Sequence, residues 1–170
     1  MERVKIVLDA DVIIHFSKGE MLSVLPQIFP EYDCIVLDIV YDELISLRRQ
    51  LDNQIEYLKN IKKEVFEPPL EMKIEYLKLT KIFGKGESAC MAYCRYTSNI
   101  IGSSNLRDIK KYCNNHKIVY LTTIDFLYYA WLRGLLTSDQ CSAFIAEVKA
   151  KGSRLPDICN IADYAPGVVI

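Results

Sequence analysis

A short apolar run that ends in two carboxylates is the feature that most constrains this chain. The residues from Val4 to Leu8 are apolar except for one lysine, and Asp9 and Asp11 follow them almost directly. Such a run is typical of a strand that is buried on both faces of a parallel sheet. The two carboxylates then lie at the carboxyl end of the strand, which is the edge where open α/β sheets bind ligands. A helix cap alone would account for only one of them.

The rest of the chain alternates short apolar runs with amphipathic segments. Further strands are predicted over 34–37, 65–66, 99–103 and 117–121. Helices are predicted over 13–25, 39–61, 70–82, 87–96, 106–115, 124–133 and 138–149. This order predicts an α/β fold with a central, mostly parallel β-sheet and helices on both faces. We expect one domain over 1–152, followed by a C-terminal tail over 153–170 that packs on the domain or extends from it.

Composition excludes several classes of protein. The formal net charge of −1 argues against a protein that coats nucleic acid non-specifically, although an enzyme that contacts a few phosphates remains compatible with it. No apolar run approaches the roughly 20 residues of a membrane helix, and the first residues lack the layout of a signal peptide. The six cysteines contain no Cys-x-x-Cys pair, which is typical of small buried thiols in a reducing compartment. We therefore expect a cytoplasmic protein without a membrane partner.

Further acidic and polar residues follow the other predicted strands. Glu43 comes soon after the second strand, Glu87 begins a helix after a glycine pair, and Asn105 and Asp108 follow the strand that ends at Ser103. Taken singly, each acid has an ordinary explanation as part of a solvated helix face or as a favourable charge at a helix start. Together they fall where parallel topology brings strand ends to one edge.

This acidic set favours a hard divalent cation. Oxygen ligands suit Mg²⁺ or Mn²⁺, and several gathered carboxylates suppress one another's ionisation unless a cation is bound among them. The chain has only two histidines, His15 and His116, so catalysis by histidine is poorly supplied. A water activated by a metal ion needs neither histidine. The sequence therefore predicts metal-assisted hydrolysis.

Four stretches, in this order, carry a resemblance to a known family. They are Leu8-Asp9-Ala10-Asp11-Val12-Ile13-Ile14, then Glu43, then Gly84-Lys85-Gly86-Glu87-Ser88-Ala89-Cys90-Met91-Ala92, then Ser103-Ser104-Asn105-Leu106-Arg107-Asp108-Ile109. The pattern resembles a PIN domain, a family that includes VapC-like toxin ribonucleases. The later runs 120–127 and 133–136 are similar to the last strand and helix of a compact bacterial branch of that family. The resemblance covers most of the chain and weakens after about Gly152.

The resemblance implies a fold, an activity and a set of site residues. It implies a central parallel sheet with helices on both faces and cleavage of RNA that depends on one or two Mg²⁺ or Mn²⁺ ions. Asp9, Glu43 and Glu87 would be metal ligands, and the last acidic position falls on Asn105 or Asp108. Many relatives carry an aspartate where Asn105 falls, whereas others pair an asparagine with an acid three residues later, as here.

The remaining expected roles concern groups around the ligands. Ser103 would position a phosphate or a water, and Asp11 would act as a helix cap or support the ligands. Basic residues near the same edge would contact phosphates, unless they only form solvated helix faces: Lys85, Arg107, Lys110 and Lys111. Besides RNA, the partners to consider are an antitoxin protein and a second copy of the chain.

The leading hypothesis is thus a metal-dependent endoribonuclease, and two alternatives stay open. The first is a PIN-like binding module without catalysis, for which Tyr93, Tyr96, Tyr128 and Tyr129 would form an interface unless they pack in the core. The second is a haloacid-dehalogenase-like phosphatase, because Asp9 and Asp11 also fit its opening motif. That family expects a pair of acids after a late strand, where this chain offers only Asp125.

Overall fold

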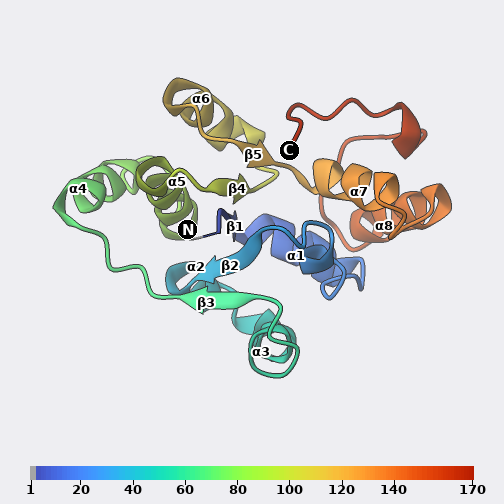
Figure 1. The fold of residues 1–170 in the computed structure, drawn as a ribbon, viewed down its shortest axis with the longest axis horizontal. Helices are drawn as coiled ribbons and strands as arrows, with labels where there is room; N and C mark the ends of the chain where they lie inside the picture. Colours follow the sequence, from blue (N-terminus) through green and yellow to red (C-terminus); the bar gives the residue numbers. More distant parts are fainter. Residues whose placement is uncertain (1–2) are drawn as a thin grey trace.

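Residues 3–170, which the computed structural model describes, contain one five-stranded sheet (Figure 1). The strands are β1 (Lys5–Leu8), β2 (Asp33–Leu37), β3 (Lys62–Glu64), β4 (Ile100–Gly102) and β5 (Tyr120–Leu121). They lie in the order β3-β2-β1-β4-β5, and every neighbouring pair is parallel. The predicted α/β class with a central parallel sheet is confirmed.

Helices cover both faces of this sheet (Figure 1). The α-helices of the described chain are α1 (Ala10–Lys18), α2 (Asp38–Glu43), α3 (Arg48–Asp52), α4 (Leu70–Leu79), α5 (Lys85–Thr97), α6 (Leu106–His116), α7 (Thr123–Leu132) and α8 (Ser138–Ala150). Helix α5 packs on β1, β2 and β4, with α4 and α6 beside it, and α1 packs with α7 and α8 on the other side. None of the helices within residues 3–170 is both long and apolar enough to cross a membrane.

The central strand β1 determines where a site can form. Its residues Ile6, Val7 and Leu8 are fully buried, because helices cover both faces of the strand. After β1 the chain adds β2 and β3 on one side of the sheet, and it then adds β4 and β5 on the other side of β1. The direction in which strands are added therefore changes between β1 and β4. Such a reversal opens a crevice beyond the carboxyl ends of the two strands. The backbone N–H of Asp9 donates to the carbonyl of Gly102 (2.9 Å), which aligns the two strand ends at this crevice.

The prediction of one long helix over 39–61 is wrong. The chain forms α2, the 3₁₀ turn η2 (Ile45–Leu47), α3 and the π-helical turn η3 (Asn53–Tyr57), and Leu44 leaves the helical region with a ψ of 48°. A straight helix over this range would extend about 34 Å, twice the length of roughly 17 Å that a five-residue strand spans. The connection from β2 must return to the parallel start of β3 within that shorter distance, so the helix folds back at Leu44.

Several element boundaries also differ from prediction, among them β5, which covers 120–121 rather than 117–121, and three others have a local cause. Helix α1 begins at Ala10 and ends before Gly19, because Asp9 occupies the N-cap position. Strand β3 covers 62–64 rather than 65–66, because the N–H of Phe66 donates to the carboxylate of Asp38 (3.0 Å) instead of continuing the sheet. Helix α5 begins at Lys85, two residues earlier than predicted, and the carboxylate of Glu43 accepts the N–H of Gly86 in its first turn.

The residues after α8 contact the domain at several points. Leu155 and Ile161 are buried, and Ile161 belongs to the 3₁₀ turn η4 (Ile161–Asp163). The hydroxyl of Tyr129 in α7 donates to the carbonyl of Val168 (3.0 Å). Five of the six cysteines are buried, whereas Cys159 in this final segment is exposed, unlike the buried thiols that the sequence suggested.

The contact between α1 and α8 yields a prediction for Gly19. A Cβ atom at this position would lie 2.3 Å from the ring of Phe144, which is fully buried and cannot move freely. We expect Gly19→Ala to lower the free energy of unfolding by about 1–3 kcal/mol through overpacking. Gly167→Ala is the control, because a Cβ there meets no atom within 4 Å. Equal denaturant midpoints for the two variants would contradict this account.

Candidate functional site

Asp9 and Asp11 lie at the carboxyl end of β1 and take different roles. Asp9 is only 6% exposed, and its carboxylate accepts the N–H of Ala10 (2.8 Å) at the start of α1. One oxygen of Asp11 accepts the N–H of Val12 (2.7 Å), and the other accepts the N–H of Ser104 (2.7 Å). Asp9 therefore holds the cap position, while Asp11 joins α1 to the loop that follows β4.

Ser103, which was expected to position a phosphate or a water, lies fully buried between these groups. Its hydroxyl is 3.5 Å from the carboxylate of Asp11 and accepts the N–H of Asn105 (3.3 Å). In this structure its contacts are internal, and they support the loop that carries Asn105.

Glu43 reaches the site from the end of α2. Its carboxylate accepts the N–H of Gly86 (2.9 Å), one of the donors in the first turn of α5 that have no partner inside the helix. A Cβ atom at position 86 would lie 2.6 Å from Oε2 of Glu43, so any side chain there would displace the end of Glu43 from this position. Gly84 is the N-cap, and α5 begins at Lys85 rather than after a Gly-Lys-Gly turn.

Asn105 connects the two remaining acids. Its amide nitrogen donates to the carboxylate of Glu87 in α5 (2.9 Å) and to that of Asp108 in α6 (2.8 Å). The asparagine and the acid three residues later therefore act together in this structure. An aspartate at position 105 would have no N–H to offer either neighbour.

The pKa values of these acids are raised by burial and by one another. Burial, followed by the charge of Asp11, raises the pKa of Asp9 to about 7, with a smaller contribution from Glu43. Burial, followed by the charges of Asp9 and Asp108, raises the pKa of Glu87 to about 8. Burial also raises the pKa of Asp11. These shifts show that the five carboxylates share one neighbourhood in which their negative charges repel.

The oxygen atoms of this site are of the type that binds a hard cation, but they are not arranged around a common point. Carboxylate and amide oxygens are the ligands that Mg²⁺ and Mn²⁺ prefer, and a cation would offset the repulsion that raises the pKa values. Within residues 3–170, no group of three or more His, Cys, Asp or Glu side chains is arranged to hold a metal ion as it stands. N–H donors of Gly86, Ser104 and Asn105 instead occupy the carboxylate oxygens.

The basic residues predicted to contact phosphates lie on the surface beside the acids. Arg107, Lys110 and Lys111 line a groove of about 440 Å³ along α6 together with Leu106, Asn114 and Asn115. Lys85 is exposed at the start of α5. Because α6 starts at Leu106, directly after Asn105, this groove begins next to the acidic residues.

A chain of hydroxyl groups, which sequence reasoning missed, extends from the site to His15. The hydroxyl of Ser104 donates to that of Thr123 (2.7 Å), and the N–H of Thr123 donates back to Ser104 (2.8 Å). The Thr123 hydroxyl lies 2.8 Å from Nδ1 of His15, which is buried in α1. The available signal was the position of Ser104 and Thr123 just beyond β4 and β5, at the same edge as Asp9.

The residues on which the alternative functions depend are mostly engaged in internal contacts. Asp125 accepts hydrogen bonds from Thr122 (2.7 Å) in the cap of α7 and from the hydroxyl of Tyr164 (2.8 Å). The hydroxyl of Tyr93 donates to Glu64 (2.8 Å). Tyr128 packs against other aromatic rings, Tyr129 is buried, and Tyr96 is 39% exposed.

No family model matches the sequence, and a comparison with curated proteins also found no match. The resemblance to PIN domains therefore depends on the motifs of the sequence, and the parallel sheet agrees with the fold that the resemblance implies.

The bridging amide of Asn105 leads to a prediction about charge. We expect Asn105→Asp to lower the free energy of unfolding by about 1–3 kcal/mol at neutral pH without divalent cations, because two hydrogen bonds are lost and a further negative charge is added. Added Mg²⁺ should recover part of the loss. Thermal unfolding with and without Mg²⁺ measures both effects. Asn115→Asp makes the same change at an exposed position of α6, and equal losses for both variants would refute the prediction.

The environment of His15 leads to a prediction about pH. Burial, and then the charge of Lys18, lower the pKa of His15 to about 4, below its ordinary value of 6.5. As the pH falls from 6.5 to 4, the unfolded chain binds a proton that the folded chain does not, so His15 removes up to about 3 kcal/mol of stability. His15→Asn keeps an acceptor for Thr123 but does not titrate. The stability advantage of the wild type over this variant should shrink across that pH range, and parallel profiles would contradict the assignment.

Proposed function

We propose that this protein is a metal-dependent endoribonuclease of the PIN type. The observation that carries the proposal is the proximity of Asp9, Asp11, Glu43, Glu87 and Asp108 at one sheet edge, where burial and mutual repulsion raise the pKa of Asp9 to about 7 and of Glu87 to about 8. A cluster that is costly without a cation is readily explained if it binds one.

The residues that would hold the cation are the acids gathered at this edge of the sheet. Asp9, Glu43, Glu87 and Asp108 would be the ligands of one or two Mg²⁺ or Mn²⁺ ions, and the amide oxygen of Asn105 is a further candidate. A cation bound there would neutralise charge on the scissile phosphate and lower the pKa of an attacking water. Asp11 and Ser103 support this set, because they fix the loop after β4 against α1.

The surface around the acids supports RNA as the substrate. The groove along α6 presents Arg107, Lys110 and Lys111, and Lys85 lies at the start of α5. These cations would bind backbone phosphates on either side of the scissile bond and compensate for the negative charge of the crevice. The substrate is then oriented with one phosphodiester at Asp9, and the protein gains affinity for RNA despite its net charge of −1.

The resemblance adds three proposals about context. As a VapC-like protein the chain would act in the cytoplasm, would be the toxin of a toxin–antitoxin pair inhibited by an antitoxin protein, and would form a homodimer. Co-purification with a protein encoded beside it tests the antitoxin, and sedimentation of the isolated chain tests the dimer.

Cleavage of RNA tests the proposal directly. Structured RNA should be cut by the wild type with Mg²⁺ or Mn²⁺ and left intact with EDTA. Asp9→Asn should lower the rate by about two orders of magnitude or more, because it removes a central ligand. Asp139→Asn is the matched control, since Asp139 is exposed in the first turn of α8, far along the chain from the acids, and its rate should stay unchanged.

Each other outcome points to a different function. Cleavage that survives both EDTA and Asp9→Asn would refute the metal-dependent mechanism. Binding of RNA and Mn²⁺ without cleavage would identify a binding module, and release of phosphate from a small phosphomonoester would identify a phosphatase.

A further inference from the structure

Helix α4 exposes an apolar stripe along its outer side. Its inner side carries Met72 and Leu79, which are buried, and Figure 1 shows the helix at the edge of the molecule, packed on α5. Leu70, Ile74 and Leu77 are 72%, 45% and 51% exposed. They follow one another at steps of four and three residues, so they lie on one face of the helix. Single exposed apolar residues are ordinary, whereas a stripe of three marks an interaction surface.

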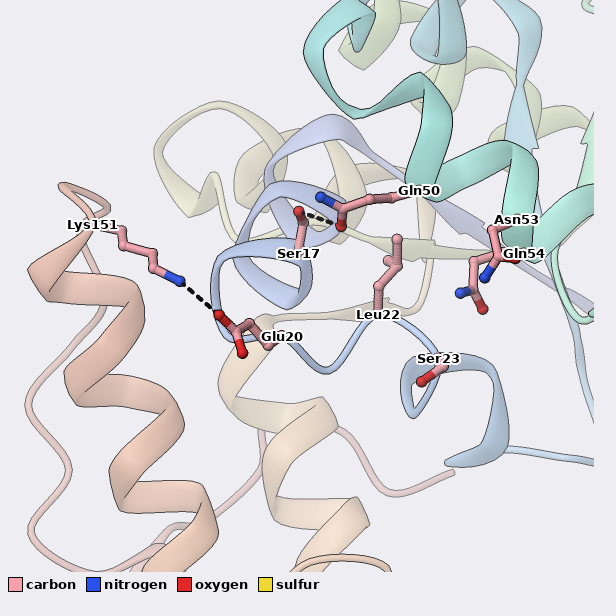
Figure 2. Close-up of a pocket in the computed structure, with 8 residues that line it drawn as sticks. All are labelled: Ser17, Glu20, Leu22, Ser23, Gln50, Asn53, Gln54 and Lys151. Carbon is pink, nitrogen blue, oxygen red and sulfur yellow. Dashed lines mark hydrogen bonds and ion pairs between the residues drawn. The ribbon is translucent and has the colours of Figure 1, made fainter.

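The hollow beside the end of α1 offers no such surface, because its polar lining residues pair with one another (Figure 2). The hydroxyl of Ser17 donates to Gln50 (2.8 Å), and the ammonium of Lys151 lies 3.4 Å from Glu20. The stripe on α4 differs in kind, since another apolar surface would remove it from water with a gain in free energy.

Charged residues flank the stripe in an order that complements itself. Glu71 and Lys78 are exposed and seven residues apart, so they lie on the same side of the stripe, one near each end of α4. Lys73 is exposed on the other side. No ion pair within residues 3–170 includes any of these three side chains. Their charges are therefore available to a partner.

These charges favour a second copy of α4 in the antiparallel orientation. Residues on the same side of two such stripes face each other when the helices run antiparallel. Glu71 of each copy then faces Lys78 of the other, and Lys73 faces Thr80, so like charges do not meet. A parallel pair would instead bring Lys73 of one copy opposite Lys78 of the other, where they repel.

The area available for this contact is small. The ten residues of α4 extend about 15 Å. A groove of about 460 Å³ borders the stripe and adds aromatic and aliphatic surface; its lining includes Ile39, Phe66, Tyr76 and Leu77. One short helix and its groove fall in the class of weak, transient interfaces. We therefore expect an equilibrium between monomer and dimer in the micromolar range.

We propose that two copies of this chain associate through α4 as an antiparallel helix pair with twofold symmetry. Ile74 of each copy packs against Leu77 of the other, and two ion pairs between Glu71 and Lys78 flank this contact. Such a twofold interface uses the same surface of both copies. The proposal gives a defined face to the homodimer that the resemblance implies. It depends on the exposed side chains of α4 and not on ribonuclease activity.

Sedimentation equilibrium of the full chain, without RNA or divalent cations, tests the association. The wild type should pass from monomer to dimer as its concentration rises. Ile74→Glu should weaken association at least tenfold, because it places a charge in the middle of the stripe. Leu132→Glu is the matched control, since Leu132 is 55% exposed in α7, outside the proposed interface, and should associate like the wild type. Circular dichroism and thermal unfolding verify that both variants are folded.

Charge reversal tests the orientation of the two helices. Lys78→Glu should weaken association about three- to tenfold at low ionic strength, because two acids then face each other on each side of the twofold axis. Combining Glu71→Lys with Lys78→Glu should restore association, because both ion pairs form again with their charges exchanged. In a parallel pair, Lys78→Glu alone would strengthen association by removing the repulsion with Lys73.

Three results would overturn the proposal. They are a chain that stays monomeric up to millimolar concentration, an Ile74→Glu variant that associates like the wild type, and a Lys78→Glu variant that associates more tightly. If the chain alone stays monomeric and a protein encoded beside it binds in a manner that Ile74→Glu abolishes, the stripe belongs to that partner instead.

Discussion

Repulsion among carboxylates at the end of β1 is the constraint on which the candidate site depends. The chain offsets this repulsion with N–H groups from two segments. In α5 the backbone of Gly86 donates to Glu43, and in the loop after β4 the backbone of Ser104 donates to Asp11 while the side-chain amide of Asn105 donates to Glu87 and Asp108. Both segments begin a helix, where backbone N–H groups lack partners and the helix dipole favours negative charge. The same features that start α5 and α6 therefore also hold the acids in place.

Much of the architecture could be predicted because its signals are local. The apolar run before Asp9 identified β1, and the alternation of strands with helices predicted a parallel sheet. The spacing of the apolar residues gave a wrong prediction over 39–61, because it continues across the break in the helix at Leu44. That break is imposed by the distance between the end of β2 and the start of β3, and spacing along the chain carries no information about this distance.

The sequence predicted which residues belong to the candidate site, but not which contacts they make with one another. The predicted topology placed Asp9, Glu43, Glu87 and Asp108 at one edge of the sheet. In the structure their charges are close enough to raise the pKa values of Asp9 and Glu87. The bridging role of Asn105 could not be read from its position, because it depends on the approach of α5 to the loop after β4.

The contact between Glu43 and Gly86 links two positions that are far apart in the sequence. The carboxylate reaches the start of α5 only because position 86 has no side chain. Alanine at position 86 would push the flexible end of Glu43 aside and leave the backbone of α5 in place. The bare backbone at position 86 therefore fixes where the Glu43 carboxylate lies, rather than how the helix itself is built.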